Sequence, residues 1–305
     1  MANKKILVVV DPTAAEHPCV DRAAWLAESV SADLELFICD YDPSIAAGRT
    51  STVYIDQPAR ENLLAILKKK LERLAGTLRH RGLKVDVDVA WDHPLVDGIV
   101  RKVLSTQPWM VVKDTHHHGV LKRTVLSNTD WGLIRDCPAP LYLAKPGPVP
   151  EKPRVFAAVD PLHEHDKPAA LDNQIFELSH FIAASTEGEL HAVHTYAIPM
   201  PIGGPEAAPS VDLIDVVAQE HQTAMVEFLA SHNLPKGNAH VLEGAPHDRL
   251  PEVVEQEGVQ ILVMGAISRS GLNRIFVGST AERLLDRVAC DVLIVKPEGF
   301  KTGVK

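Results

Sequence analysis

The sequence contains a long internal repeat. Val10-Asp11-Pro12 follows an apolar run near the N-terminus, and Val159-Asp160-Pro161 follows a second run of the same kind. Lys145-Pro146 and Lys296-Pro297 each close a copy, and the interval from the aspartate to the closing proline is nearly equal in both. A unit of roughly 150 residues matches one ordinary domain and far exceeds a solenoid repeat. The repeat therefore predicts two domains of one fold, and differences between the copies indicate where function lies.

The composition limits which kinds of partner the chain is expected to bind and in which cellular compartment it is expected to lie. The formal net charge of -9 argues against a nucleic acid as main partner, because a surface that follows phosphates needs clustered Lys and Arg. The four cysteines are widely spaced and form no C-x-x-C pair, which is typical of reduced cytosolic proteins. The first apolar run is too short for a signal peptide or a membrane span. We therefore expect a cytoplasmic protein that binds neither nucleic acid nor membrane.

Short apolar runs alternate with amphipathic stretches in both copies, and this alternation predicts a parallel α/β sheet in each. Strands are expected at 5–10, 34–39, 84–90, 109–113 and 141–144, and again at 154–159, 189–194, 239–243, 260–264 and 291–295. Helices are expected at 16–31, 57–81, 94–106 and 128–136, and again at 169–185, 211–232, 246–257 and 279–288.

Two local patterns sharpen this prediction. Leucines recur at three- and four-residue steps along the helix 57–81 and predict one buried stripe: Leu63, Leu67, Leu71, Leu74 and Leu78. Valines alternate with aspartates along the strand 84–90, which indicates a half-exposed strand at or near a sheet edge. Prolines cluster at 147–153 and predict a stiff linker between domains 1–146 and 153–305.

The loops after the strands are where a ligand is expected, because open parallel sheets bind ligands beyond the carboxyl ends of their strands. In the second copy, a loop rich in glycine, serine and arginine runs from Gly265 to Gly278, and Ser279-Thr280 then opens a helix. Glycines allow close approach of an anion, and a helix N-terminus attracts it. The alternative is a plain connection with turn glycines. The sequence contains no Walker loop, G-x-G-x-x-G, H-E-x-x-H or G-x-S-x-G motif.

With these residues in place, the chain resembles the universal stress protein family over nearly its whole length, in the tandem arrangement of the UspE-like subgroup. The nucleotide-binding signature of that family runs Gly, two residues, Gly, nine residues, Gly, then Ser or Thr. Here Gly265, Ser268, Gly278 and Ser279 stand at those places, with serine replacing the second glycine. The family's aspartate after the first strand, which resembles an adenine or ribose contact, corresponds to Asp160.

The resemblance implies fold, ligand and site together. The fold is two tandem five-stranded parallel sheets of order 3-2-1-4-5 flanked by helices, the adenine nucleotide alpha hydrolase-like fold. The ligand is ATP, ADP or AMP, with Mg²⁺ as a potential companion. The implied nucleotide-binding residues are Asp160, Gly265, Ser268, Arg269, Gly271, Gly278, Ser279 and Thr280. Because single-domain relatives usually pair, the two copies are expected to form an internal pseudo-dimer in a monomeric or homodimeric protein.

The first copy departs from the signature. Aligned by sequence, Lys113 stands where Gly265 does and His116 where Ser268 does, while Asp11 matches Asp160. Side chains longer than that of glycine occupy the room that a phosphate would need. We therefore expect the first copy to bind ATP poorly or not at all.

Histidines have replaced the signature in the first copy. His116, His117 and His118 follow one strand, and His93 follows another strand whose carboxyl end is expected at the same edge. Imidazoles with a carboxylate suit zinc, so these four residues form a candidate metal site. The alternative is a solvated histidine-rich turn. His191 and His194 lie on an expected strand of the second copy, where a packed or hydrogen-bonded imidazole is the ordinary case.

Three functions remain open from the sequence. The first is a stress-response binding module whose C-terminal domain holds an adenine nucleotide, and this is the one that we favour. The second is a slow ATP hydrolase, which would need a positioned water, a base and usually Mg²⁺. The third is a structural platform with silent nucleotide sites, with or without zinc in the N-terminal domain.

Overall fold

The structure, a computed structural model, describes residues 4–47, 56–117, 124–162, 169–198, 211–266 and 279–305. The chain divides into two compact units between residues 149 and 150, inside the expected linker 147–153. The last five residues, 301–305, group with the first unit, although the sequence placed them in the second domain. One contact that holds this segment is a hydrogen bond from Nη1 of Arg101 to the main-chain oxygen of Lys305, at 3.3 Å.

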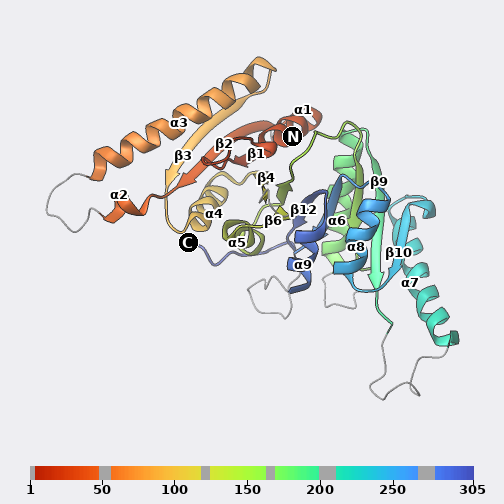
Figure 1. Cartoon of the computed structure of the whole chain (residues 1–305). Helices are drawn as coiled ribbons and strands as arrows, with labels where there is room; N and C mark the ends of the chain where they lie inside the picture. Colours follow the sequence, from red (N-terminus) through yellow and green to blue (C-terminus); the bar gives the residue numbers. More distant parts are fainter. Residues whose placement is uncertain (1–3, 48–55, 118–123, 163–168, 199–210, 267–278) are drawn as a thin grey trace. The chain divides into compact units, whose positions relative to one another are not determined.

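The first unit is a parallel sheet of five strands with helices between them (Figure 1). Its main strands are β1 (Lys5–Val9), β2 (Asp33–Asp40), β3 (Val85–Trp91), β4 (Met110–Asp114) and β7 (Leu141–Ala144). Its helices are α1 (Pro18–Val30), α2 (Pro43–Ala47), α3 (Asp56–His80), α4 (Leu95–Thr106) and α5 (Asn128–Asp136). A separate pair of short strands, β5 (His116–His117) and β6 (Thr124–Val125), was not predicted.

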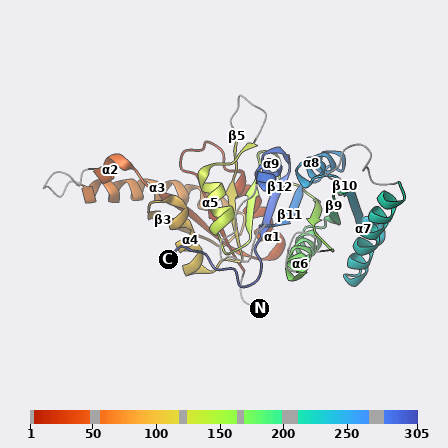
Figure 2. The same cartoon turned by 90° about the horizontal axis from the view of Figure 1, so that it is seen from below.

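The second unit repeats this plan. Its strands are β8 (Arg154–Ala158), β9 (Glu189–Tyr196), β10 (Ala239–Glu243), β11 (Ile261–Gly265) and β12 (Asp291–Val295). Its helices are α6 (Ala169–Ser185), α7 (Val211–Ser231), α8 (Pro246–Gln256) and α9 (Ser279–Arg287), with a 3-10 turn η3 (Lys236–Asn238). Seen from below, α6 lies on the opposite side of the strands from α8 and α9 (Figure 2).

Pairing within each unit is parallel throughout. In the first unit β1 lies between β2 and β4, with β3 beyond β2 and β7 beyond β4. In the second unit β8 lies between β9 and β11, with β10 beyond β9 and β12 beyond β11. The predicted α/β fold with helix-flanked parallel sheets is thereby confirmed. Chain order reverses beside the first strand of each unit, which is where such sheets bind ligands.

The sequence patterns have direct physical counterparts in the core. The apolar strands are buried because helices cover both faces of a parallel sheet, and Leu7, Phe156 and Leu262 are each 0% exposed. Along α3, the leucine stripe is buried at its centre, where Leu71 is 0% exposed. The alternating strand β3 forms one edge of its sheet and is only partly buried.

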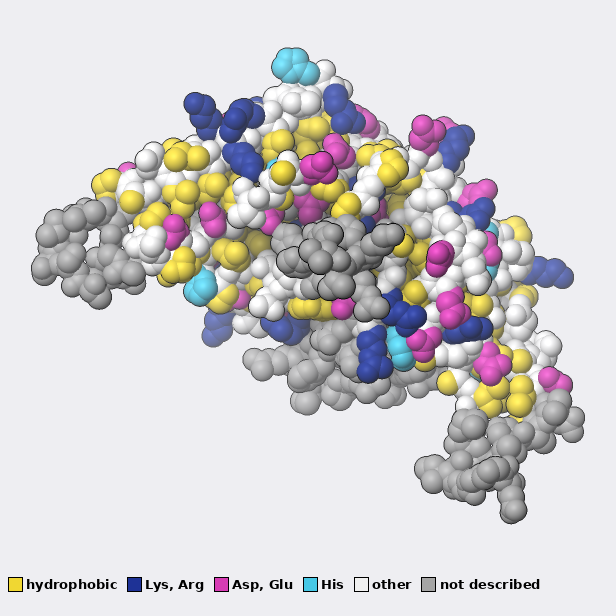
Figure 3. Space-filling view, viewed as in Figure 1, with side chains coloured by type: hydrophobic (Ala, Val, Ile, Leu, Met, Phe, Trp, Pro, Cys, Tyr) yellow, Lys and Arg dark blue, Asp and Glu magenta, His cyan; other side chains and the backbone are white. Residues whose placement is uncertain are grey.

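The face of the molecule shown in Figure 3 carries mixed charge. On the face shown in Figure 3, Lys and Arg side chains lie beside Asp and Glu side chains over the described part of the chain. Such mixing differs from the clustered basic surface that binds nucleic acid. Among the residues that the structure describes, every helix is too short or too polar to cross a lipid bilayer.

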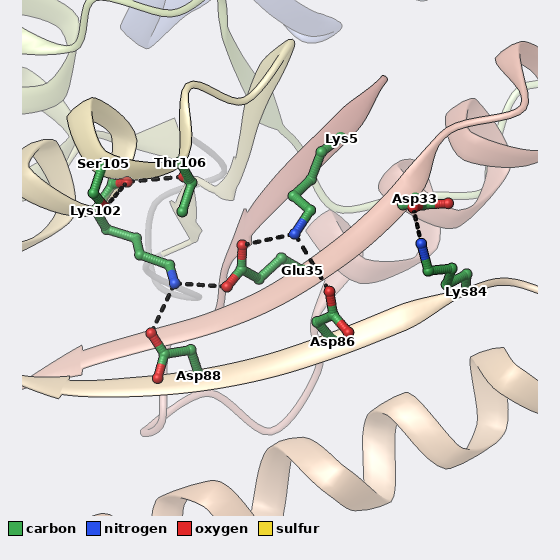
Figure 4. Close-up of polar contacts among 9 residues, drawn as sticks. All are labelled: Lys5, Asp33, Glu35, Lys84, Asp86, Asp88, Lys102, Ser105 and Thr106. Atoms are coloured by element: carbon green, nitrogen blue, oxygen red, sulfur yellow. Dashed lines mark hydrogen bonds and ion pairs between the residues drawn. The ribbon is translucent and has the colours of Figure 1, made fainter. Parts of the chain in front are cut away.

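A buried carboxylate in the first unit is stabilised by lysines (Figure 4). Glu35 on β2 is 6% exposed. Its Oε1 lies 2.6 Å from Nζ of Lys102 on α4, and its Oε2 lies 3.5 Å from Nζ of Lys5. Lys102 also contacts Asp88 on β3 at 2.7 Å. Burial alone lowers the pKa of Lys102, but its bonds to Asp88 and Glu35 outweigh burial and raise that pKa. The ion pairs therefore connect α4 to the edge of the sheet.

Replacing Lys102 should show how much free energy the burial of the Glu35 carboxylate costs when its nearest cation is gone. In Lys102→Met we expect the free energy of unfolding to fall by about 3 kcal/mol, because Glu35 loses its nearest cation. Glu35→Gln combined with Lys102→Met should recover part of that loss. Urea denaturation of both variants and wild type measures the effect. Equal losses in the single and double variants would contradict the assignment.

Candidate functional site

The ends of β8 and β11 lie side by side in the second unit. Ala158, the last residue of β8, pairs with Met264 of β11 on one side and with Val193 of β9 on the other. The chain leaves β8 toward β9 and returns to β11 only after β10. Asp160 therefore follows β8 at the point where chain order reverses, which is the position at which open α/β sheets bind their ligands.

Asp160 is buried, with 8% of its surface exposed. Its backbone N–H donates a hydrogen bond to Oδ1 of Asp172 at 3.1 Å. Asp172 lies in the first turn of α6 and is 1% exposed. A backbone group at the end of a strand has lost its ladder partner and needs another when it is buried. The carboxylate of Asp172 supplies that partner and holds the start of the loop.

Two buried histidines lie next to this loop. Nδ1 of His194 lies 3.1 Å from the main-chain oxygen of Val159, and its Nε2 lies 2.8 Å from Nδ1 of His221 on α7. His194 and His221 are 3% and 2% exposed. The ring of Tyr196 stacks on His221 with centroids 4.4 Å apart. Burial, with a smaller effect of Glu243, raises the pKa of Tyr196.

The expected phosphate loop is described only at its two ends. Gly265 is the last residue of β11 and pairs with Val295. Ser279 and Thr280 are the first two residues of α9, so a helix begins where the sequence predicted. The remaining predicted contacts lie outside the described residues: Ser268, Arg269, Gly271 and Gly278. The structure thus places Asp160 and Gly265 at neighbouring strand ends.

The register between the two copies corrects one prediction. Val10 donates to the oxygen of Phe37 as Val159 donates to that of Val193, so Asp11 corresponds to Asp160. However, Asp114 pairs with Ala144 as Gly265 pairs with Val295, and each closes the fourth strand of its unit. Asp114, and not Lys113, is therefore the counterpart of Gly265. The sequence alignment was one residue out of register.

Asp114 is buried and bonded within the first unit. It is 5% exposed, and its Oδ2 accepts a hydrogen bond from Sγ of Cys19 at 3.1 Å. Oδ1 of Asp114 accepts another from the backbone N–H of Cys19, in the first turn of α1. Burial raises the pKa of Asp114, while the bonds from Cys19 and the charge of Lys113 act against that rise. Burial, together with Asp114, raises the pKa of Cys19 well above its ordinary value.

The neighbouring lysine, Lys113, is also bonded within the first unit. Nζ of Lys113 lies 2.6 Å from Oδ1 of Asp130, which is 0% exposed, and donates to the oxygen of Asp114 at 3.0 Å. Asp130 belongs to a capping box with Ser127 at the start of α5. Oδ1 of Asp11 accepts from the backbone N–H and the hydroxyl of Thr13, both at 2.7 Å. The first unit therefore carries a buried carboxylate, that of Asp114, at the strand end where the second unit has Gly265.

The candidate metal residues are only partly described. His93 follows β3, and its ring stacks on Tyr41 with centroids 4.5 Å apart. His116 and His117 form β5, and His118 lies outside the described residues. In the described part of the chain, no group of three or more His, Cys, Asp or Glu side chains is arranged to hold a metal ion. The zinc site stays a prediction.

Sequence analysis took His194 as a packed or hydrogen-bonded imidazole, which the structure bears out, but it assigned no role to His221. The bond between the two rings joins residues on different elements. One signal was available, because His194 and Tyr196 alternate on one face of the strand and Ile38 replaces the histidine in the first copy.

Comparison with known proteins places this geometry in a family. The model of the universal stress protein family matches residues 2–145 and again residues 154–296. The chain is 27% identical over 306 residues to Universal stress protein E of Escherichia coli strain K12, across 99% of this chain and 96% of that protein. It is 26% identical over 313 residues to Universal stress protein E of Photorhabdus laumondii, across 100% of this chain and 99% of that protein.

Solved structures share the fold. A protein of unknown function from Pseudomonas aeruginosa PAO1 superposes with a TM-score of 0.75 at 24% identity, covering 98% of this chain and 94% of that one. A universal stress protein from Archaeoglobus fulgidus superposes with a TM-score of 0.69 at 17% identity, covering 97% of this chain and 100% of that one. The predicted resemblance to tandem, UspE-like proteins is confirmed.

The raised pKa of Asp114 predicts how the stability of the first unit changes with pH. A carboxyl whose pKa is raised by folding binds its proton more tightly in the folded state. The free energy of unfolding then falls as pH rises from the ordinary pKa of 3.8 through the raised value. Asp114→Asn removes this loss, so its midpoint of thermal unfolding should rise relative to that of wild type as the pH increases above about 4.

The matched control for this measurement is Asp21→Asn, which changes an exposed carboxyl in the first turn of α1. Its midpoint should stay parallel to that of wild type across the same pH range. A constant difference between Asp114→Asn and wild type at every pH would contradict the burial of a charged Asp114.

Proposed function

The chain belongs to the universal stress protein family, and on this premise we propose that its second unit binds an adenine nucleotide, namely ATP, ADP or AMP. The observation that carries the proposal is the contrast at one edge of the two sheets. In the second unit the fourth strand ends in Gly265 beside the buried Asp160. In the first unit it ends in Asp114, whose carboxylate is buried against Cys19.

The chemistry of the second edge suits a nucleotide. Asp160 offers a carboxylate to hydroxyl or amino groups of the nucleoside, since carboxylates accept hydrogen bonds from such donors. A glycine at the end of β11 has no side chain to keep phosphate oxygens away from its backbone. The start of α9 adds backbone N–H groups, which favour anions at a helix N-terminus. Arg269 would add a charge-assisted contact, and Mg²⁺ would accompany a polyphosphate.

We propose that the nucleotide acts as a signal rather than as a substrate. The protein would be a cytoplasmic stress-response module, in which occupancy of the second unit changes the partners that the chain binds. All four cysteines are buried thiols, as expected in a reducing compartment. The two copies would act as an internal pseudo-dimer within a monomeric or homodimeric protein. Slow hydrolysis and a platform with silent sites are the competing functions.

The paired aspartates test the proposal with a built-in control. Asp160→Ala in the full-length protein should weaken binding of ATP by about tenfold or more, because the nucleotide loses a hydrogen bond to a charged group. Asp11→Ala removes the matching aspartate of the first copy and should leave affinity unchanged. Isothermal titration measures both.

Release of labelled phosphate, measured with and without Mg²⁺, separates binding from hydrolysis on the same samples. A background rate supports the binding module, whereas a rate that falls in Gly278→Ala supports the hydrolase. Tight binding in Asp160→Ala but not in Asp11→Ala would assign the nucleotide to the first unit and overturn the proposal.

The zinc hypothesis has its own measurement. If His93, His116, His117 and His118 hold a zinc ion, the triple variant His116→Ala, His117→Ala and His118→Ala should lose it, because three of about four ligands are gone. Elemental analysis of the purified proteins reports the metal content. Equal zinc in wild type and variant, or none in either, removes the site.

A further inference from the structure

One peptide group in the second unit is held from both sides by buried side chains. The C=O of Val159 and the N–H of Asp160 belong to the same planar peptide unit. The N–H donates to Oδ1 of Asp172 on α6 at 3.1 Å. The oxygen lies 3.1 Å from Nδ1 of His194 on β9. Because the plane is rigid, these two contacts fix the direction in which the chain enters Asp160.

The contacts also determine where the protons lie on the imidazoles. A carbonyl oxygen only accepts hydrogen bonds, so Nδ1 of His194 must carry a proton and donate it to Val159. Nδ1 of His194 also lies 3.8 Å from Oδ1 of Asp160, which favours a charged ring, whereas burial favours a neutral one. We infer the neutral ring, in which Nε2 of His194 is an acceptor. Nδ1 of His221, 2.8 Å away, must therefore be the donor of the bond between the rings. His221 thus fixes the tautomer that His194 needs to hold the peptide group.

The surroundings keep this chain of hydrogen bonds away from water. His194, His221 and Asp172 are 3%, 2% and 1% exposed. Tyr196 covers one face of the His221 ring with centroids 4.4 Å apart. Buried hydrogen bonds are stronger than exposed ones, and an unmade one is costly. Breaking one of these hydrogen bonds would therefore leave a buried polar group without its partner.

The first unit cannot form the same arrangement. Its backbone bond from Val10 to Phe37 matches the bond from Val159 to Val193, which places Ile38 where His194 stands. Isoleucine has no polar side-chain atom and cannot donate to the carbonyl before Asp11. We call the arrangement in which His194 and Asp172 hold the peptide group before Asp160 the clamp. The clamp therefore occurs in the unit that we propose to bind the nucleotide and is missing from its copy.

We propose that His194 and Asp172 are positioning residues for the nucleotide, with His221 setting the tautomer of His194. Together they hold the peptide group that precedes Asp160 and so direct its carboxylate toward the ligand. This inference rests on the proposed nucleotide site and names three side chains that the family signature does not include.

Two substitutions of one residue test the role of the bond between the rings. His221→Leu removes the donor, and His221→Asn keeps one, because its amide nitrogen lies the same number of bonds from Cα as Nδ1 of histidine. We expect ATP affinity of the full-length protein to fall about tenfold in His221→Leu. In His221→Asn it should stay within about threefold of wild type, because the donor is retained. Thermal unfolding without nucleotide confirms that each variant is folded.

The matched control is His240→Leu. His240 also bonds to a histidine, with its Nε2 3.1 Å from Nδ1 of His191, and packs against Phe156. His191 and His194 project from opposite faces of β9, because they lie three residues apart on a strand. Affinity should be unchanged in His240→Leu. Wild-type affinity in His221→Leu, or equal losses in the leucine and asparagine variants, would overturn the proposal.

An imidazole nitrogen spectrum separates this inference from the proposed function. In protein with labelled histidine and no nucleotide, His194 should show a protonated Nδ1 and an unprotonated Nε2, with the signal assigned by its loss in His194→Gln. The opposite tautomer overturns the clamp even if ATP binds and Asp160→Ala weakens it. Conversely, the expected tautomer with no ATP binding in wild type shows that the proposed function has failed.

Discussion

Each unit depends on the burial of one central strand between two neighbours that come from distant parts of the chain. β1 pairs with β2 and β4, and β8 pairs with β9 and β11. Parallel strands need long crossovers, so the chain passes first to one side of the central strand and later to the other. The loops that follow the first and fourth strands are thereby brought to one edge. The differences between the copies that bear on a ligand lie at that edge.

The two copies use this edge in opposite ways. In the first, the fourth strand ends in Asp114, and its carboxylate accepts two hydrogen bonds from Cys19. Lys113 forms a buried ion pair with Asp130. Buried charges are tolerable only when they are paired in this way. A phosphate entering here would meet a carboxylate already bonded to a helix N-terminus. In the second copy, the same strand position is Gly265, which brings neither a charge nor a side chain.

Much of the fold was accessible from the sequence because it rests on local patterns. Apolar runs separated by amphipathic stretches predicted the strands and helices of both units, and the leucine stripe of α3 predicted its buried face around Leu71. The position of Asp160 at the end of β8 followed from the repeat. Local patterns do not carry long-range register, so the counterpart of Gly265 was misplaced by one residue. The bond between His194 and His221 joins a strand to a helix, so the signal in the strand sequence did not reveal the partner of His194.

The internal hydrogen bonds at this edge hold different groups in the two copies. In the first unit they hold carboxylates: Asp11 accepts from Thr13 and Asp114 accepts from Cys19, so the acids at the edge are bonded within the unit. In the second unit the bonds from His194 and to Asp172 hold the backbone that carries Asp160. Fixing a backbone costs conformational entropy during folding rather than during binding, which is the general advantage of a preorganised site. Duplication allows this division, because one copy can fill its edge with internally bonded acids while the other keeps an edge suited to a ligand.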